Sequence, residues 1–230
     1  MDHTVRAYDE DLDAITAELA RMGGLAEAEV ADSIRAITRR DLALAEAVIG
    51  RDARLDALEM EIERKAIRLI ALRQPVADDL RRTVAAMKIA SNLERCGDLA
   101  KNIAKRVLVI AEADPVTPLS ASIERMGELV TGRLKDVLDT LASREVERAV
   151  GVWMNDHEID EHYDAIFREL LTYMMGDPRT IAACAHLLFV AKNLERIGDH
   201  ATNIAEILHY EITGVELTDE RPKSDALGKP

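Results

Sequence analysis

The chain has 230 residues, of which 48% are hydrophobic and 32% are charged, so one or two domains with an ordinary hydrophobic core can form. Aromatic residues make up only 3%, and the 11 glycines and 6 prolines are too few for a collagen-like or largely disordered chain. The net charge of −13 argues against a protein that binds nucleic acid. Because the core must be built mainly from aliphatic residues, we predict an all-α protein.

The sequence contains no feature typical of secretion or membrane insertion. The N-terminal stretch is acidic and lacks an apolar signal-peptide core, and no run reaches the roughly 18 apolar residues that span a bilayer. Cys96 and Cys184 lie in apolar surroundings far from any CxxC pattern and are interpreted as buried thiols in a reducing compartment. We therefore expect a cytoplasmic protein that reaches the membrane only through its partners.

Apolar residues recur at three- and four-residue spacing in six segments, each typical of an amphipathic helix. The first covers about residues 6–48, where the pair Gly23-Gly24 allows a bend. Two stripes follow from Leu55 to Leu72 and, after Pro75, from Leu80 to Val107. Three further helices are predicted at about 119–152, 154–175 and 178–213. The polar tail from Val215 to Pro230 is predicted to be disordered.

The two halves of the chain repeat each other. Met22-Gly23 recurs as Met126-Gly127, at an offset of 104 residues. Residues 90–104 recur as residues 191–205 with eleven of fifteen positions identical. Such agreement between helices indicates a tandem duplication. We predict two tandem three-helix bundles, residues 1–114 and 115–214, with the boundary near Pro115 and a tail at 215–230.

Acidic residues spaced four apart occupy equivalent places in both halves. The four pairs are Asp52/Asp56, Glu94/Asp98, Asp156/Asp160 and Glu195/Asp199. Residues four apart share one face of a helix. Within each half, the two pairs lie at similar distances from the turn that joins their helices, so an antiparallel hairpin brings four carboxylates to one level. The sequence thus predicts two clusters of four carboxylates, at the flank or surface of the bundles rather than in their cores.

Clustered carboxylates repel one another, and a multivalent cation with oxygen ligands offsets this repulsion. We predict a divalent or multinuclear metal at each cluster, with Asn102 and Asn203 as outer ligands one turn further along. The alternative is a solvated acidic face without metal, neutralised by Arg95, Arg196 and other nearby basic residues. Gly97 lies within the acidic motif of the first half and Gly198 within that of the second. A glycine inside a helix costs about 1 kcal/mol relative to alanine, so these two indicate close approach by another helix or by the site itself.

No pattern favours an enzyme. His157 and His162 are five residues apart and would diverge around a helix, unlike the histidines of HExxH. Neither acidic cluster carries the Glu-x-x-His pair of di-iron proteins, and no nucleophile accompanies a histidine at a repeated position. We predict no catalytic residues. A metal-dependent oxidase or hydrolase is the alternative that redox-active iron with turnover would support.

The repeated Asn-Leu-Glu-Arg-x-Gly-Asp-x-Ala-x-Asn-Ile-Ala stretches, with QPVADDLR at 74–81, resemble the PhoU family of bacterial phosphate-sensing and phosphate-uptake accessory proteins. The resemblance extends over essentially the whole chain up to the tail. It implies two three-helix bundles and metal ions, including multinuclear iron or zinc clusters, at the same eight acidic residues. The second half has GDPRTIAA at 176–183 in place of QPVADDLR, so a contact made by the first turn is not expected at the second.

The resemblance also implies a role in regulation. Such proteins repress the phosphate-starvation response when phosphate is plentiful. They connect the high-affinity phosphate ABC transporter, through its ATPase subunit, to a sensor histidine kinase and its response regulator. We expect the same partners, a homodimer, and iron, zinc, manganese or magnesium as the metal. The alternatives are a regulator of a low-affinity phosphate carrier and a metal-free helical scaffold.

Overall fold

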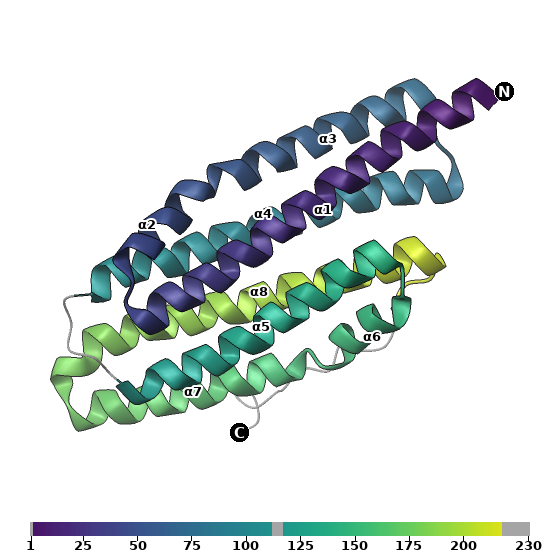
Figure 1. Cartoon of the computed structure of the whole chain (residues 1–230). Helices are drawn as coiled ribbons and strands as arrows, with labels where there is room; N and C mark the ends of the chain where they lie inside the picture. Colours follow the sequence, from purple (N-terminus) through teal and green to yellow (C-terminus); the bar gives the residue numbers. More distant parts are fainter. Residues whose placement is uncertain (1, 112–116, 218–230) are drawn as a thin grey trace.

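The computed structural model describes residues 2–111 and 117–217, which form α-helices joined by short connections (Figure 1). The first bundle contains α1 (Asp2–Arg39), α2 (Leu42–Arg51), α3 (Ala53–Arg73) and α4 (Ala77–Ile110). The second contains α5 (Thr117–Ser143), α6 (Val146–Met154), α7 (His157–Gly176), the short 3-10 turn η1 (Pro178–Thr180) and α8 (Ile181–Thr213). In each bundle a short helix continues into a long one to form the middle arm. The predicted all-α fold of two tandem three-helix bundles is confirmed. The predicted boundary at Pro115 and most of the predicted tail lie outside the described residues.

The first helix of each bundle ends earlier than predicted. A single helix was expected over 6–48, but α1 ends at Arg39 because Arg40 adopts a left-handed conformation with φ of 53°. The carboxylate of Asp41 then caps α2 by accepting a hydrogen bond from the Leu44 amide at 2.9 Å. The second half breaks in the same way after α5, where Arg144 has φ of 60°, so the predicted helix over 119–152 is also two helices.

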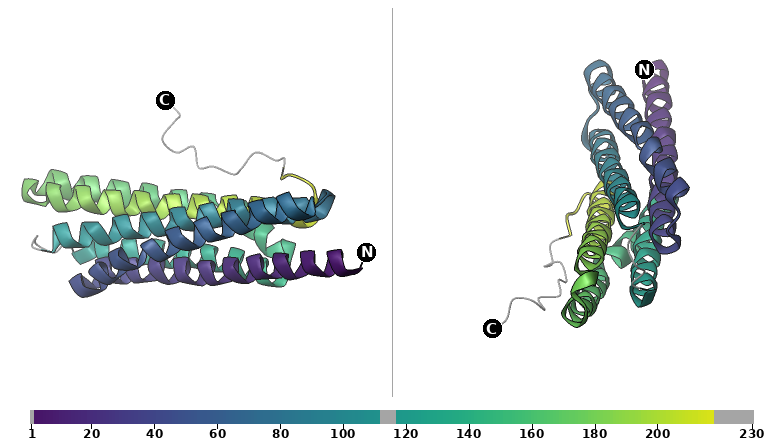
Figure 2. Two further views of the ribbon diagram at one scale, coloured as in Figure 1. Left: turned by 90° about the horizontal axis from the view of Figure 1, so that it is seen from above. Right: turned by 90° about the vertical axis from the view of Figure 1, so that its left-hand side faces the viewer.

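The two bundles lie side by side and share an interface made by α1, α4, α5 and α8 (Figures 1 and 2). Repeated glycines let α1 and α5 approach closely. A Cβ at Gly127 would lie 2.7 Å from Ile34 of α1, and a Cβ at Gly23 would overlap Leu138 of α5. Ile34 and Leu138 are themselves related by the 104-residue offset. Gly23 therefore serves the packing of the bundles, and α1 runs through the glycine pair without ending.

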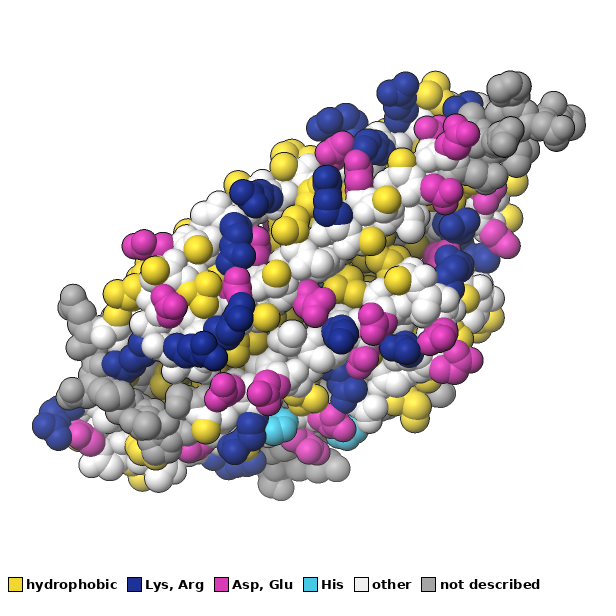
Figure 3. Space-filling view, in the orientation of Figure 1, with side chains coloured by type: hydrophobic (Ala, Val, Ile, Leu, Met, Phe, Trp, Pro, Cys, Tyr) yellow, Lys and Arg dark blue, Asp and Glu magenta, His cyan; other side chains and the backbone are white. Residues whose placement is uncertain are grey.

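The core is aliphatic, as the composition predicts, and both cysteines are buried free thiols. One face of the molecule shows acidic and basic side chains interspersed over both bundles (Figure 3). Within the described ranges, no helix combines the length and apolar character needed to cross a membrane.

Candidate acidic metal sites

The middle arm of each bundle holds one carboxylate of its cluster inside the protein. Asp52 precedes the first residue of α3 and is 4% exposed, and Asp156 holds the same position before α7 and is 6% exposed. The prediction of a site wholly at the flank or surface was therefore wrong for these two residues. The reason is that both residues fall on the apolar stripe of their arm, Asp52 between the buried Val48 and Leu55, and Asp156 between the buried Val152 and Ile159.

In the first cluster, side chains from α3 and α4 converge. The Lys101 ammonium donates hydrogen bonds to Asp52 and, at 3.4 Å, to Asp98. Burial, followed by the neighbouring charge of Asp98, raises the pKa of Glu94 to about 7, and Asp56 contributes in the same direction. Asp98 and Asp56 thus act on Glu94, and Lys101 connects Asp98 to Asp52.

A fifth carboxylate, which the sequence analysis did not identify, comes from α1. Glu29 is 2% exposed, and its Oε2 atom has no hydrogen-bond partner. That atom would lie 3.5 Å from a Cβ added at Gly97, which stands between Glu94 and Asp98 in the sequence of α4. Burial raises the pKa of Glu29 to about 7, and the charge of Asp52 adds to this effect. The only signal in the sequence is an acidic residue within the apolar stripe of the first helix.

The second cluster forms between α7 and α8. Burial raises the pKa of Asp160 to about 6, and the charges of Asp156, Glu195 and Asp199 add to the effect in that order. The Thr202 hydroxyl donates to Asp156 at 2.7 Å. The Lys192 ammonium donates to Glu195 Oε1 at 2.7 Å, whereas Glu195 Oε2 is buried without a hydrogen-bond partner. The four carboxylates predicted for the second half are therefore also brought together.

The two predicted outer ligands differ in their surroundings. Asn203 Nδ2 approaches Asn92 Oδ1 of α4 at 3.5 Å, and His200 Nδ1 lies 2.9 Å from the same oxygen. Asn203 thus takes part in the contact between α4 and α8. Asn102, its equivalent in the first half, is exposed on α4.

The repeated glycines of the motifs allow close helix packing. A Cβ at Gly198 would lie 2.6 Å from Ile159 of α7, and a Cβ at Gly97 would overlap Leu55 of α3. Leu55 and Ile159 are equivalent residues of the two halves. The expectation of close approach by another helix is confirmed, and this approach draws the acidic faces of the paired helices together.

Carboxylate oxygens are the donors that hard divalent cations such as Mg²⁺ and Mn²⁺ prefer, so the residue types of both clusters fit a metal. As placed, no three acidic, histidine or cysteine side chains of the described residues surround one point at metal-binding distance. In the first cluster the Lys101 ammonium lies between Asp52 and Asp98 and supplies positive charge there. A bound cation would take over the role of this ammonium.

The fold and the repeated clusters define a duplicated helical protein with paired acidic sites. The PhoU domain model matches residues 19–107 and 123–208. The chain belongs to the PhoU family. It is 68% identical over 228 residues to the phosphate-specific transport system accessory protein PhoU homolog of Caulobacter vibrioides, covering 99% of both chains. It is 52% identical to the homolog of Rhizobium meliloti, covering 97% of this chain and 94% of that one.

Solved structures agree with this assignment. The crystal structure of PhoU from Pseudomonas aeruginosa superposes with a TM-score of 0.88 at 34% identity, covering 90% of this chain and all 100% of the other. The phosphate transport system regulatory protein PhoU from Streptococcus pneumoniae gives a TM-score of 0.84 at 29% identity, covering 91% and 99%. The resemblance stated from the sequence motifs is confirmed.

Proposed function

We propose that this protein is a cytoplasmic negative regulator of the phosphate-starvation response. It acts as an adaptor between the ATPase subunit of a phosphate ABC transporter and a sensor histidine kinase with its response regulator. The observation that carries the proposal is the 68% identity, over 99% of both chains, to an accessory protein of phosphate-specific transport. The agreement covers both bundles, so it favours a shared role for the whole chain rather than for one domain.

The proposed mode of action is binding rather than catalysis. The elongated two-bundle body offers long helical faces to partners (Figure 2). The acidic clusters would hold divalent cations through Asp52, Asp56, Glu94 and Asp98 in the first half and Asp156, Asp160, Glu195 and Asp199 in the second. A bound cation would supply positive charge that neutralises the repelling carboxylates. The buried Oε2 of Glu195, which lacks a hydrogen-bond partner, supports this assignment.

The test uses a strain that lacks the gene and is grown in high phosphate. We expect alkaline phosphatase output to rise in the deletion strain and to return to the repressed level when the wild-type gene is supplied on a plasmid. Unchanged output together with altered phosphate uptake would instead favour regulation of a low-affinity carrier. Unchanged output and uptake would contradict the proposal.

A second set of strains tests the acidic clusters. The eight carboxylates are replaced by their amides, and the matched control is the exposed pair Glu124→Gln and Glu128→Gln, four apart on α5. The control should repress normally. The eightfold variant should lose both metal content and repression. A purified eightfold variant that is folded, lacks metal and still represses would leave a metal-free scaffold as the working form.

A further inference from the structure

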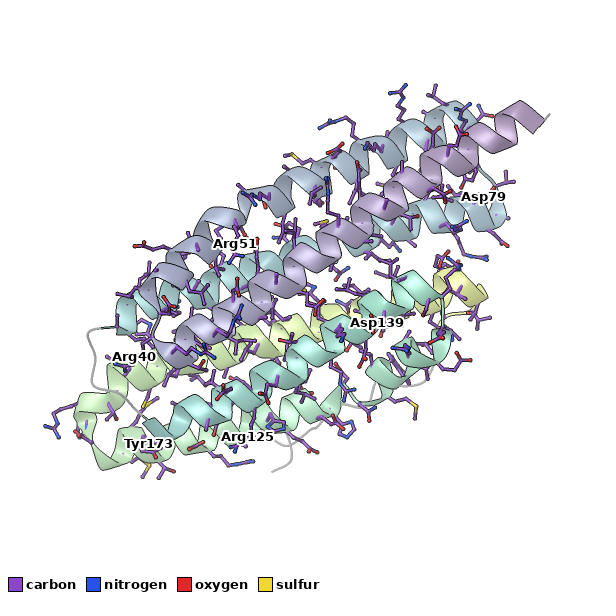
Figure 4. The ribbon with its side chains drawn as sticks, in the orientation of Figure 1. Arg40, Arg51, Asp79, Arg125, Asp139 and Tyr173 are labelled. Carbon is purple, nitrogen blue, oxygen red and sulfur yellow. The ribbon has the colours of Figure 1, made fainter. Side chains whose placement is uncertain are left out.

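Glu29 is a buried carboxylate that lies beside the first acidic cluster, near Gly97 and within the influence of the Asp52 charge. It projects from the C-terminal third of α1, and its Oε2 atom has no hydrogen-bond partner although the residue is only 2% exposed. The atom lies against Gly97, the residue between the acidic pair of α4. By contrast, Asp32, one turn further along α1, is held by Arg35 and by Arg51 of α2, which Figure 4 labels. The charges of Arg51 and Arg54 favour the ionised form of Glu29, but a buried carboxylate oxygen without a hydrogen bond is costly unless a proton or a cation accompanies it.

The second half has the opposite charge at the equivalent position. The 104-residue offset that relates Asp52 to Asp156 relates Glu29 to Arg133. Arg133 is largely enclosed, with a side chain 16% exposed, and it forms an ion pair with Glu158 of α7. Glu158 in turn corresponds to Arg54 of the first half. The acid and the base have exchanged places between the repeats.

The partners of the buried aspartates differ as well. Lys101 holds Asp52 in the first half, whereas the neutral Thr202 occupies the equivalent position and donates to Asp156 in the second. The first cluster therefore has five carboxylates from α1, α3 and α4 with a lysine between two of them. The second has four carboxylates from α7 and α8, and its first helix contributes an arginine in place of the fifth.

We propose that Glu29 is a fifth carboxylate ligand of the first cluster, so that the two cation sites of this protein are not equivalent. This inference rests on the proposed metal binding at the acidic clusters. A cation in the first site is held by three helices and ties α1 to the α3–α4 hairpin. A cation in the second site is held by the α7–α8 hairpin alone. Because ligand charge and number set the affinity of oxygen-ligand sites, the first site binds a divalent cation more tightly.

The experiment titrates Mn²⁺ into the chelator-treated full chain by calorimetry, with Mn²⁺ electron paramagnetic resonance as a second readout. The wild-type protein should show a tight and a weaker class of site. The double variant Glu94→Gln with Asp98→Asn should remove the tight class, which assigns that class to the first cluster. Glu195→Gln with Asp199→Asn should remove the weaker class, which assigns it to the second. Glu29→Gln should weaken the tight class about tenfold, the lower end of what changes at metal sites cost. It should leave the weaker class unchanged.

Two further variants act at the equivalent position of the second half. Arg133→Gln is the matched control and should leave the tight class unchanged. The charge exchange Arg133→Glu with Glu158→Arg reproduces the arrangement of the first half and should strengthen the second site about tenfold. It also keeps the proposal testable if Glu29→Gln fails to fold.

The outcomes separate the two proposals. Glu29 is not a ligand if Glu29→Gln leaves both affinities at wild-type values while Glu94→Gln with Asp98→Asn removes one class of site. Where Glu29→Gln does not fold, the same result with the charge exchange at Arg133 and Glu158 leads to the same conclusion. In both cases the proposed metal binding stands. If the wild-type chain takes up no Mn²⁺ at millimolar concentration, the metal binding itself is refuted, and the role of Glu29 falls with it.

Discussion

Replacing Glu29 by glutamine should stabilise the metal-free protein at alkaline pH. The folded state raises the pKa of this carboxyl from the ordinary 4.5 to about 7, because burial and the charge of Asp52 disfavour its ionised form. The folded state therefore binds this proton more tightly than the unfolded state does. The resulting stabilisation is fully present below pH 4.5 and is lost as the pH rises through about 7.

The size of the effect follows from the same two pKa values. A shift of one pKa unit is worth about 1.4 kcal/mol, so the shift from 4.5 to about 7 corresponds to at most about 3–4 kcal/mol at pH 8. Glutamine has the same shape and cannot ionise, so Glu29→Gln should gain about 1–3 kcal/mol at that pH. For a chain of this size, each kcal/mol moves the melting temperature by about 2–4 °C. The gain should shrink strongly at pH 5, where the wild-type Glu29 keeps its proton.

The assay is thermal unfolding followed by circular dichroism in the presence of a chelator, at pH 5 and pH 8. Asp32→Asn is the matched control on the same helix. Burial opposes ionisation of Asp32, but hydrogen bonds from Arg51 and Arg35 outweigh it and keep the pKa below its usual value. This variant should therefore lose stability at pH 8, the opposite sign. A Glu29→Gln melting temperature at or below that of the wild type at pH 8, or an equal gain at both pH values, would refute the reasoning.

Three further predictions concern neighbouring parts of the fold. Lys101→Met removes the cation between two carboxylates and should lower the melting temperature in chelator by several degrees. Added Mn²⁺ should restore most of this loss, and a loss that persists in Mn²⁺ would contradict a site there. Gly198→Ala should lower the free energy of unfolding by about 1–3 kcal/mol in a urea titration, because its Cβ meets α7 at 2.6 Å. Gly132→Ala, with open space around it on α5, is the control and should raise the free energy of unfolding by up to about 1 kcal/mol. Glu211→Gln should lower the free energy of unfolding by about 1 kcal/mol, because the buried carboxylate accepts a hydrogen bond from Arg144 at 3.0 Å and joins α8 to the end of α5. An unchanged urea unfolding curve would show that this pair adds nothing to stability.

Helix faces and the duplication could be predicted from the sequence, because apolar spacing and repeated motifs are local signals. The helix breaks could not be predicted in the same way. Arg40 and Arg144 adopt positive φ without being glycine, so composition gave no sign of the turns. Asp41 was a usable signal, since an aspartate that precedes an apolar run is a frequent N-cap. The expectation that Asp52 and Asp156 lie at the surface was wrong for another reason: each stands three residues before a buried residue, Leu55 or Ile159, and so shares the apolar face of its arm.

The four carboxylates of each half were found because duplication made their spacing conspicuous, and the same duplication hid the fifth. Glu29 has an arginine as its counterpart, so a comparison of the halves marks it as unrelated to the repeated pattern. The pairs that differ between the halves, Glu29 with Arg133 and Lys101 with Thr202, are the ones that set the charge around each cluster. The backbone of one half can thus be deduced from that of the other, because packing depends on repeated apolar and glycine positions. The proposed cation binding cannot, because it would depend on the few buried charged positions at which the repeats diverged.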